Sequence, residues 1–117
     1  MPAAIALTRR PEFLAVASKG KKWVGTGLIL QALRRSDPML DKAAIRFGLT
    51  ASRRVGGAVQ RNRARRRLRA LAREVLPSLG QPGCDYVLIA RPATVARPFR
   101  DLRGDLEKAL CYLHQKA

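Results

Sequence analysis

Residues 52–73 read SRRVGGAVQRNRARRRLRALAR, and this stretch decides how the rest of the chain is organised. Gly56 and Gly57 break the pattern that precedes them, and from Ala58 onward apolar residues recur at a helical period. The apolar positions are Ala64, Leu68, Leu71, Ala72 and Val75. The other side of the same helix carries Asn62, Arg66, Arg69 and Arg73, flanked by Arg61 and Arg65. The spacing predicts an amphipathic helix over residues 58–76, ended by Pro77, with one packed face and one basic face.

Outward from this helix, the patterns alternate between strands and helices. Residues 45–52 alternate apolar with polar side chains, as a half-buried strand does, and the apolar run at residues 86–90 predicts a buried strand. A further strand is predicted over residues 23–33, a loop at residues 36–38, and helices over residues 11–20 and from Pro98 to the end. The order α-β-β-α-β-α predicts an α+β fold, a single-domain α/β sandwich over residues 9–117 behind a flexible tail at residues 1–8.

The net charge points to a polyanionic partner. The chain holds 24 Lys and Arg against eight Asp and Glu, a formal charge of +16, and Arg makes up 18 of the 24. No acidic residue lies between Asp41 and Glu74, so residues 42–73 carry +11. Arginine pairs bidentately with phosphate and stacks on bases, which favours nucleic acid as the partner. The longest stretch without charge, Trp23 to Leu33, is too short for a membrane span. With no secretory signal in view, we expect a cytoplasmic protein.

Residues for protein-based catalysis are scarce. His114 is the only histidine, the acids are scattered, and Cys84 and Cys111 lack metal-ligand spacing. We therefore expect no catalytic residue and no metal site in the chain, and two free thiols rather than a disulfide. The concentrated signal is the glycine pair at the helix start. There phosphate can approach free backbone N–H groups, and the arginines that follow add charge-assisted contacts. The alternative is a solvated basic face.

The residues just described resemble the signature of the bacterial ribonuclease P protein subunit. The family carries a basic pair, a glycine turn, an Arg-Asn-Arg motif and a basic helix, which here stand within residues 52–73. RFGLTA (46–51) is similar to the family's third strand, DYVLIAR (85–91) to its fourth, and PEFLAVASKG (11–20) to its first helix. The resemblance covers roughly residues 7–113. It implies about four strands, an N-terminal and a C-terminal helix, and a central Arg-rich helix in a left-handed β-α-β crossover, although crossovers are generally right-handed.

The resemblance also implies a function. The family's protein assists a catalytic RNA that uses Mg²⁺ to remove the 5′ leader from precursor tRNA, so Mg²⁺ is expected to be held mainly by the RNA. The expected partners are this RNA and precursor tRNA, with no membrane and no protein partner required. The implied RNA-binding residues are Arg53, Arg54, Gly56, Gly57, Arg61, Asn62, Arg63, Arg65, Arg66 and Arg69. The implied leader cleft lies between the first helix and the sheet, with Phe13 as a stacking residue; the alternative for Phe13 is ordinary core packing.

The chain departs from the family pattern at several of these positions. Gly57 stands where members often have Asn, and Arg53 and Arg54 replace the usual lysines. A second cleft aromatic falls on Ala17 and a tyrosine on Gln31, so Val16, Thr50 and Ser52 are expected to shape the cleft instead. Three rival functions stay open on the residues alone: a ribosomal or RNA-chaperone protein, an autonomous ribonuclease, and a duplex-DNA binder.

Overall fold

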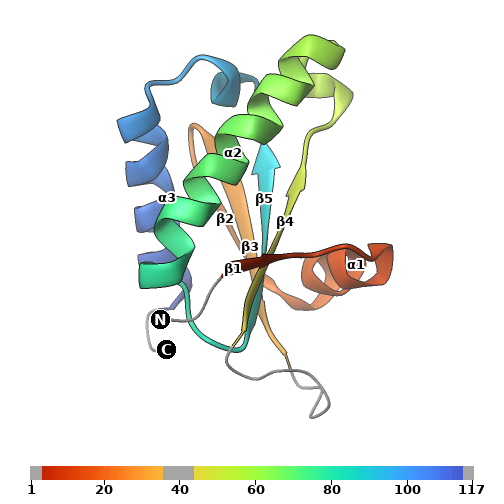
Figure 1. The fold of residues 1–117 in the computed structure, drawn as a ribbon, viewed down its shortest axis with the longest axis vertical. Coiled ribbons are helices and arrows are strands. Elements are labelled where there is room, and N and C mark those ends of the chain that lie inside the picture. The colour runs from red at the N-terminus through yellow and green to blue at the C-terminus, as the bar shows by residue number, and fades with distance from the viewer. Residues whose placement is uncertain (1–3, 36–43, 115–117) are drawn as a thin grey trace.

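The computed structural model describes residues 4–35 and 44–114, which form a five-stranded sheet with three helices (Figure 1). The strands are β1 (Ala4–Ala6), β2 (Lys21–Val24), β3 (Leu28–Arg34), β4 (Ile45–Thr50) and β5 (Cys84–Ala90). The helices are α1 (Arg10–Lys19), α2 (Ala58–Leu79) and α3 (Phe99–Leu113), with the short 3₁₀ helices η1 (Arg53–Val55) and η2 (Pro92–Val95). The predicted α+β class is confirmed, with five strands in place of about four.

The sheet is mixed, and its strand order is β1-β4-β5-β3-β2. β4 and β5 are parallel neighbours, with Arg46 opposite Asp85 and Thr50 opposite Ile89, and α2 connects them. This is the predicted β-α-β crossover through the basic helix. β3 pairs antiparallel with both β5 and β2. The short helix η1 and the two glycines that follow it connect the end of β4 to the start of α2.

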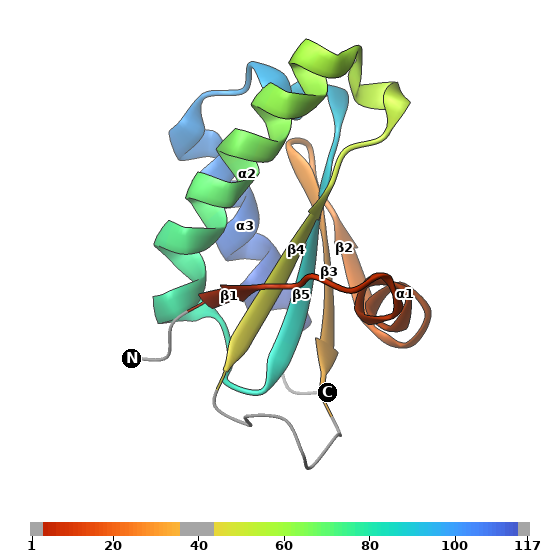
Figure 2. The same cartoon turned by 45° about the vertical axis from the view of Figure 1, so that its right-hand side comes forward.

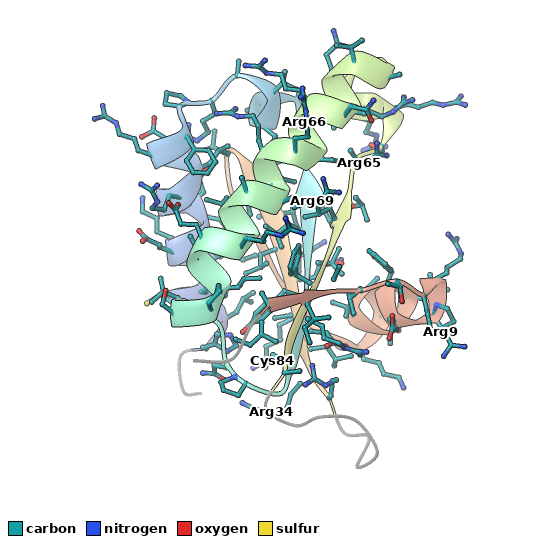
Figure 3. All side chains as sticks on the ribbon, in the orientation of Figure 1. Arg9, Arg34, Arg65, Arg66, Arg69 and Cys84 are labelled. Carbon is teal, nitrogen blue, oxygen red and sulfur yellow. The ribbon has the colours of Figure 1, made fainter. Side chains whose placement is uncertain are left out.

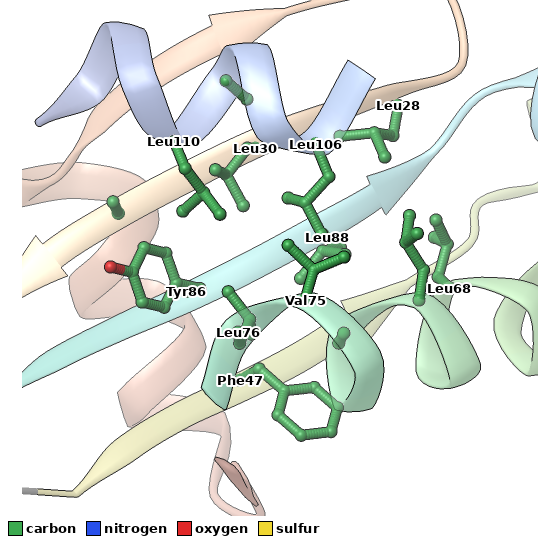
Figure 4. Packing of buried hydrophobic residues seen from close by; sticks show 14 of the residues in the cluster. Leu28, Leu30, Phe47, Leu68, Val75, Leu76, Tyr86, Leu88, Leu106 and Leu110 are labelled. Atoms are coloured by element: carbon green, nitrogen blue, oxygen red, sulfur yellow. The ribbon is translucent and has the colours of Figure 1, made fainter. Parts of the chain in front are cut away.

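The two faces of the sheet are covered unequally. α2 and α3 lie on one face, and α1 alone lies on the other (Figures 1 and 2). The face under α2 and α3 carries the main core, in which Leu30, Tyr86, Leu88, Leu68 and Leu106 are all fully buried (Figure 4). The alternation predicted for β4 is confirmed, since Ile45 and Phe47 belong to this core whereas Arg46 and Gly48 contact α1. A smaller core under α1 is formed by Leu7, Val16 and Val87.

Two of the predicted elements differ near the N-terminus. Ala4–Ala6 pair in parallel with β4, and Leu7 is buried, so residues 4–7 belong to the fold and not to a flexible tail. The predicted strand over residues 23–33 is two strands joined by a tight turn. The N–H of Gly25 donates to the carbonyl of Leu28 at 3.0 Å, and the Trp23 ring lies against Gly25 where a side chain would stand. Gly25 and Gly27 therefore lie in the hairpin turn that joins β2 to β3.

The ends of other elements also shift. α2 continues through Pro77 to Leu79, because its last turn is buried at Val75 and Leu76 and closed by the N–H of Gly80 on the carbonyl of Leu76. β4 ends at Thr50 instead of residue 52, and β5 begins two residues earlier, at Cys84. Both cysteines are free, as predicted. The predicted loop at residues 36–38 lies outside the described residues.

Candidate nucleic-acid interface

The turn that leads into α2 is shaped by its two glycines in different ways. Gly56 has φ 141°, a conformation that side chains other than glycine rarely adopt. Gly57 has an ordinary extended conformation and is the N-cap of α2, where no side chain caps the helix. No acidic residue lies in the first helical turn. The free N–H groups and the helix dipole therefore face solvent, which is a favourable arrangement for a phosphate.

The segment before this turn presents two exposed arginines. Ser52 caps η1 by accepting a hydrogen bond from the N–H of Arg54 at 3.3 Å. Val55 is buried and anchors η1 to the core, while Arg53 and Arg54 are exposed. The predicted RNA-binding residues from 53 to 57 thus lie together at one end of the molecule, next to the start of α2.

The outward face of α2 forms a shallow depression. Its volume is about 470 Å³, and it is lined by Val59, Asn62, Arg65, Arg66 and Arg69. The last three are labelled along the outer side of α2 in Figure 3. Arg65 donates to the side chain of Asn62 at 3.3 Å and to the carbonyl of Ala51 at 3.5 Å, which fixes its guanidinium beside the end of β4. The structure therefore brings four predicted residues into one concave, cationic surface.

A second depression lies between α2 and α3, with a volume of about 340 Å³ and a lining of Arg63, Arg66, Arg67, Ala70 and Phe99. Arg63 donates to the carbonyl of Val95 at 2.9 Å. Arg67 donates to the carbonyls of Thr94 and Arg97, so it holds η2 against α2. Burial, and then the charge of Arg63, lower the pKa of Arg67 below its usual range. Arg67 is thus a structural residue, whereas the exposed Arg63 stays available to a ligand.

Among the residues that the structure describes, no acidic side chain pairs with an arginine of α2. In residues 4–35 and 44–114, the ion pairs join Arg35, Arg46, Arg97 and Arg103 to Glu12, Glu74, Asp85 and Asp105. None of these pairs uses an arginine of the predicted Arg61–Arg69 set. Guanidinium groups buried against carboxylates would have contradicted an RNA-binding role, and the described residues show none in this set.

Arg46 is the exception within the acid-free stretch of sequence. It donates to Glu12 at 2.6 Å and to both oxygens of Asp85, at 2.8 and 2.6 Å. The hydrogen bond and charge of Asp85, followed by Glu12, raise the pKa of Arg46 against the opposing effect of burial. Glu12 also accepts from the N–H groups of Thr8 and Arg9 at the start of α1. Arg46 therefore ties α1 to the sheet and does not contribute to the open basic surface.

The predicted leader cleft is only partly supported by geometry. Phe13 lies over Gly48, so closely that a side chain there would overlap the ring, and it stays half-buried. Val16 is only 1% exposed and packs against Leu7 and Val87, so the prediction that it shapes the cleft is wrong. Ala17 is exposed.

The far part of the same sheet face is more open than the part under α1. Thr50, Ile89 and Ile29 are register partners on adjacent strands, point to the α1 side, and are each half-buried. Ser52 follows at the exposed end of this row. α1 thus covers the row that contains Gly48 and Val87 and leaves the Thr50 row partly accessible.

One residue of the α2 surface, Val59, is not among the residues predicted from the sequence. Val59 is 77% exposed, and it lines the depression beside Asn62. Its spacing would have identified it, because residues 59, 62, 66 and 69 follow the three- and four-residue steps of one helix face.

The described part of the chain offers neither a metal-binding cluster nor a membrane-spanning helix. No three side chains of His, Cys, Asp or Glu gather there in a way that could hold a metal ion. No helix among those residues is long and apolar enough to cross a membrane.

Comparison with known proteins relates the whole chain to one family. The family model "Ribonuclease P" matches residues 1–114. The "Ribonuclease P protein component" of Ruegeria pomeroyi is 48% identical over 109 residues, covering 92% of this chain and 85% of the relative. That of Paramagnetospirillum magneticum is 46% identical over 104 residues, covering 89% and 78%.

Solved structures agree on the fold. The RNase P protein of Staphylococcus aureus superposes with a TM-score of 0.73 at 21% identity, covering 93% of this chain and 94% of that one. The RNase P protein of Thermotoga maritima gives a TM-score of 0.72 at 23% identity, covering 96% and 97%. With a family model over nearly the full length and relatives approaching half identity, this chain belongs to the ribonuclease P protein component family.

Proposed function

We propose that this chain is the RNA-binding subunit of a ribonuclease P, a ribonucleoprotein that removes the 5′ leader from precursor tRNA. The chain binds the catalytic RNA and the leader in the cytoplasm, and no further protein partner is required. The cleavage step takes place on the RNA, and the protein raises the affinity for substrate and for Mg²⁺ by neutralising phosphate repulsion.

One observation carries this proposal: the arginines on the outer face of α2 line a concave surface, with Arg66 and Arg69 exposed and Arg65 half-buried, and are not paired with described carboxylates. Arg65, Arg66 and Arg69 offer planar donors to phosphate oxygens, and Asn62 adds an amide that can donate and accept. The uncapped start of α2 adds backbone N–H groups at the same end. Together these groups favour a folded RNA, whose backbone presents phosphates at several angles.

The leader is proposed to lie on the open part of the sheet face beyond α1. Phe13 offers a half-exposed ring there, and the row of Thr50, Ile89 and Ile29 offers a weakly apolar floor. Aromatic stacking tolerates any base, so this surface suits a single strand of varied sequence. Because Ala17 and Gln31 supply no second ring, stacking rests on Phe13.

Mg²⁺ enters the proposal as an ion held mainly by the RNA. The described acids do not gather into a set of ligands, and four of the six are engaged in ion pairs with arginines. The donor set of the described residues therefore does not fit a magnesium site of the protein's own. We assign no catalytic residue to the chain.

Reconstitution tests the proposed function directly. The full chain is combined with the catalytic RNA of a relative and a precursor tRNA at low Mg²⁺, and the release of leader is measured. We expect the chain to accelerate cleavage by the RNA and to cleave nothing alone. Cleavage by the protein alone in EDTA would point to an autonomous ribonuclease. Recovery of ribosomal RNA in a pull-down, or preference for duplex DNA over folded RNA, would support the other rivals.

A further inference from the structure

A cavity unrelated to the α2 surface lies where α1 meets β2. Its volume is about 420 Å³, and its walls come from the end of α1, from β2 and β3, from the segment before β5, and from the end of α3. Figure 3 labels Arg34 and Cys84 of this cavity at the end of the molecule away from Arg65 and Arg66. A cavity of this size accommodates a small ligand.

Two lining residues of the cavity, Gln81 and His114, are held in place by the buried Tyr86. The hydroxyl of Tyr86 accepts from the N–H of Gln81 at 2.8 Å and lies 2.6 Å from Nε2 of His114. The two rings meet edge to face, with centroids 5.7 Å apart. His114 is therefore held in one orientation.

The rim of the cavity is cationic. Lys19, Lys21 and Arg34 line it, and no acidic side chain is among its described lining residues. Arg34 is held in place by a 2.8 Å hydrogen bond from its guanidinium to the side chain of Gln81. Burial lowers the pKa of His114, and the charges of Arg34 and Lys21 lower it further. Three like charges around a histidine are unfavourable in the empty cavity and become favourable once an anion enters.

We propose that this cavity binds the phosphate of a nucleotide. Lys19, Lys21 and Arg34 would neutralise the phosphate, and the His114 ring would contact it from the same cavity wall. The apolar wall formed by Ala32, Leu33 and Leu113 would contact the ribose or base. The same chemistry is offered by a free nucleoside monophosphate and by a phosphodiester of an RNA strand. The inference does not depend on the proposed function, because the cavity lies apart from the α2 surface.

His114 provides the measurement, because it is the only histidine in the chain. Its ring protons are followed by NMR in the full chain at constant ionic strength, while uridine 5′-monophosphate, inorganic phosphate, uridine or a short single-stranded RNA is added. We expect the monophosphate to shift the His114 signals in a saturable manner and uridine to leave them in place. If only the RNA strand shifts them, the phosphate comes from a phosphodiester. If neither the monophosphate nor the RNA strand shifts the His114 signals at millimolar concentrations, the proposal fails.

Two neighbouring lysines on β2 provide a matched pair of variants. Lys21→Gln removes a charge from the cavity, whereas Lys22→Gln removes the same charge one residue along, outside the cavity lining. Both side chains are exposed, so both variants are expected to fold. We expect Lys21→Gln to weaken binding of the monophosphate by about three- to fivefold and Lys22→Gln to leave it unchanged. Equal weakening would show attraction to net charge alone and would overturn the proposal.

Discussion

Removing Arg65 and Arg69 together should change how RNA binding responds to salt. Both side chains line the depression on α2, and each is expected to contact one phosphate. A protein that neutralises phosphates releases counterions, so the slope of log affinity against log salt scales with the number of contacts, at about 0.7–0.9 for each. Losing two contacts should therefore lower the slope by about 1.4–1.8.

The size of the effect follows from the number of contacts. With about six phosphates neutralised, affinity falls roughly a thousandfold when salt rises fourfold, and with four the fall is roughly a hundredfold. The double variant should thus bind more weakly than the parent at 50 mM salt and lose part of that difference at 200 mM. The assay is titration of labelled catalytic RNA at several monovalent salt concentrations and one fixed Mg²⁺ concentration.

A second double variant separates position from net charge. Arg100→Ala with Lys108→Ala removes the same two charges from exposed positions on α3. We expect this control to keep the parent's slope within error. Because Arg65 also donates to the carbonyl of Ala51, thermal unfolding of each variant must be compared with the parent. An unchanged slope in the α2 variant, or an equal change in both variants, would refute the assignment of these arginines to the RNA interface.

Three further predictions concern the framework of the site. Gly56→Ala should destabilise the fold by about 1–3 kcal/mol, because Gly56 has φ 141°. Gly57→Asn should leave stability unchanged or raise it by a few tenths of a kcal/mol, since asparagine is a good N-cap for α2. Denaturant unfolding of both variants checks this, and equal losses of stability would contradict it. Gly48→Ala should displace the Phe13 ring that lies against it and weaken binding of a single-stranded leader more than binding of the catalytic RNA; equal effects on the two RNAs would argue against a leader site there. Burial raises the pKa of Glu12, but hydrogen bonds from backbone N–H groups and the charge of Arg46 outweigh burial and lower this pKa below 4.5. The contribution of Glu12 to stability is therefore present above pH 4.5 and is lost as the pH falls through the lowered pKa. Between pH 6 and pH 3 the free energy of unfolding should fall less steeply for Glu12→Gln than for the parent, and parallel curves would count against the ion pair.

Local patterns were sufficient to predict the elements that contain the basic site. The stripe of Ala64, Leu68 and Leu71 predicts the helix because those side chains bury one face, and each is fully buried in the structure. The alternation in residues 45–50 fixes which side of β4 faces the core for the same reason. The exposed residues of α2 then follow from geometry, since the face opposite a buried stripe must meet solvent.

Other features depend on contacts distant in sequence and were not predictable. Proline usually ends a helix, because it has no backbone N–H and its ring crowds the preceding turn. Pro77 is expected to end α2 for this reason. Here the burial of Val75 and Leu76 against the sheet outweighs that penalty. Similarly, the strand at Ala4–Ala6 exists only because the edge of β4 is available to pair with it. The local sequence around Pro77 and that of residues 4–6 do not indicate which distant residues they pack against or pair with.

The placement of Val16 shows a second kind of limit. A resemblance can place a residue on the correct helix without fixing how far that helix turns towards the sheet. In α1, the rotation is set by Glu12, which joins Arg46 on β4, and by Phe13, which fits over Gly48. That rotation directs Val16 into the small core.

The separation of charge explains how so basic a chain remains folded with an open cationic face. The acids that pair are buried or lie at junctions between elements: Asp85 joins Arg35 and Arg46, and Asp105 joins Arg97 and accepts from the N–H of Gly27. Each such pair leaves one fewer carboxylate to neutralise α2, whose arginines repel one another at helical spacing. The helix tolerates that repulsion because its other face is fully buried. The arginines of α2 thus form an open cationic surface, on which an RNA backbone would supply the missing negative charge under the proposed function.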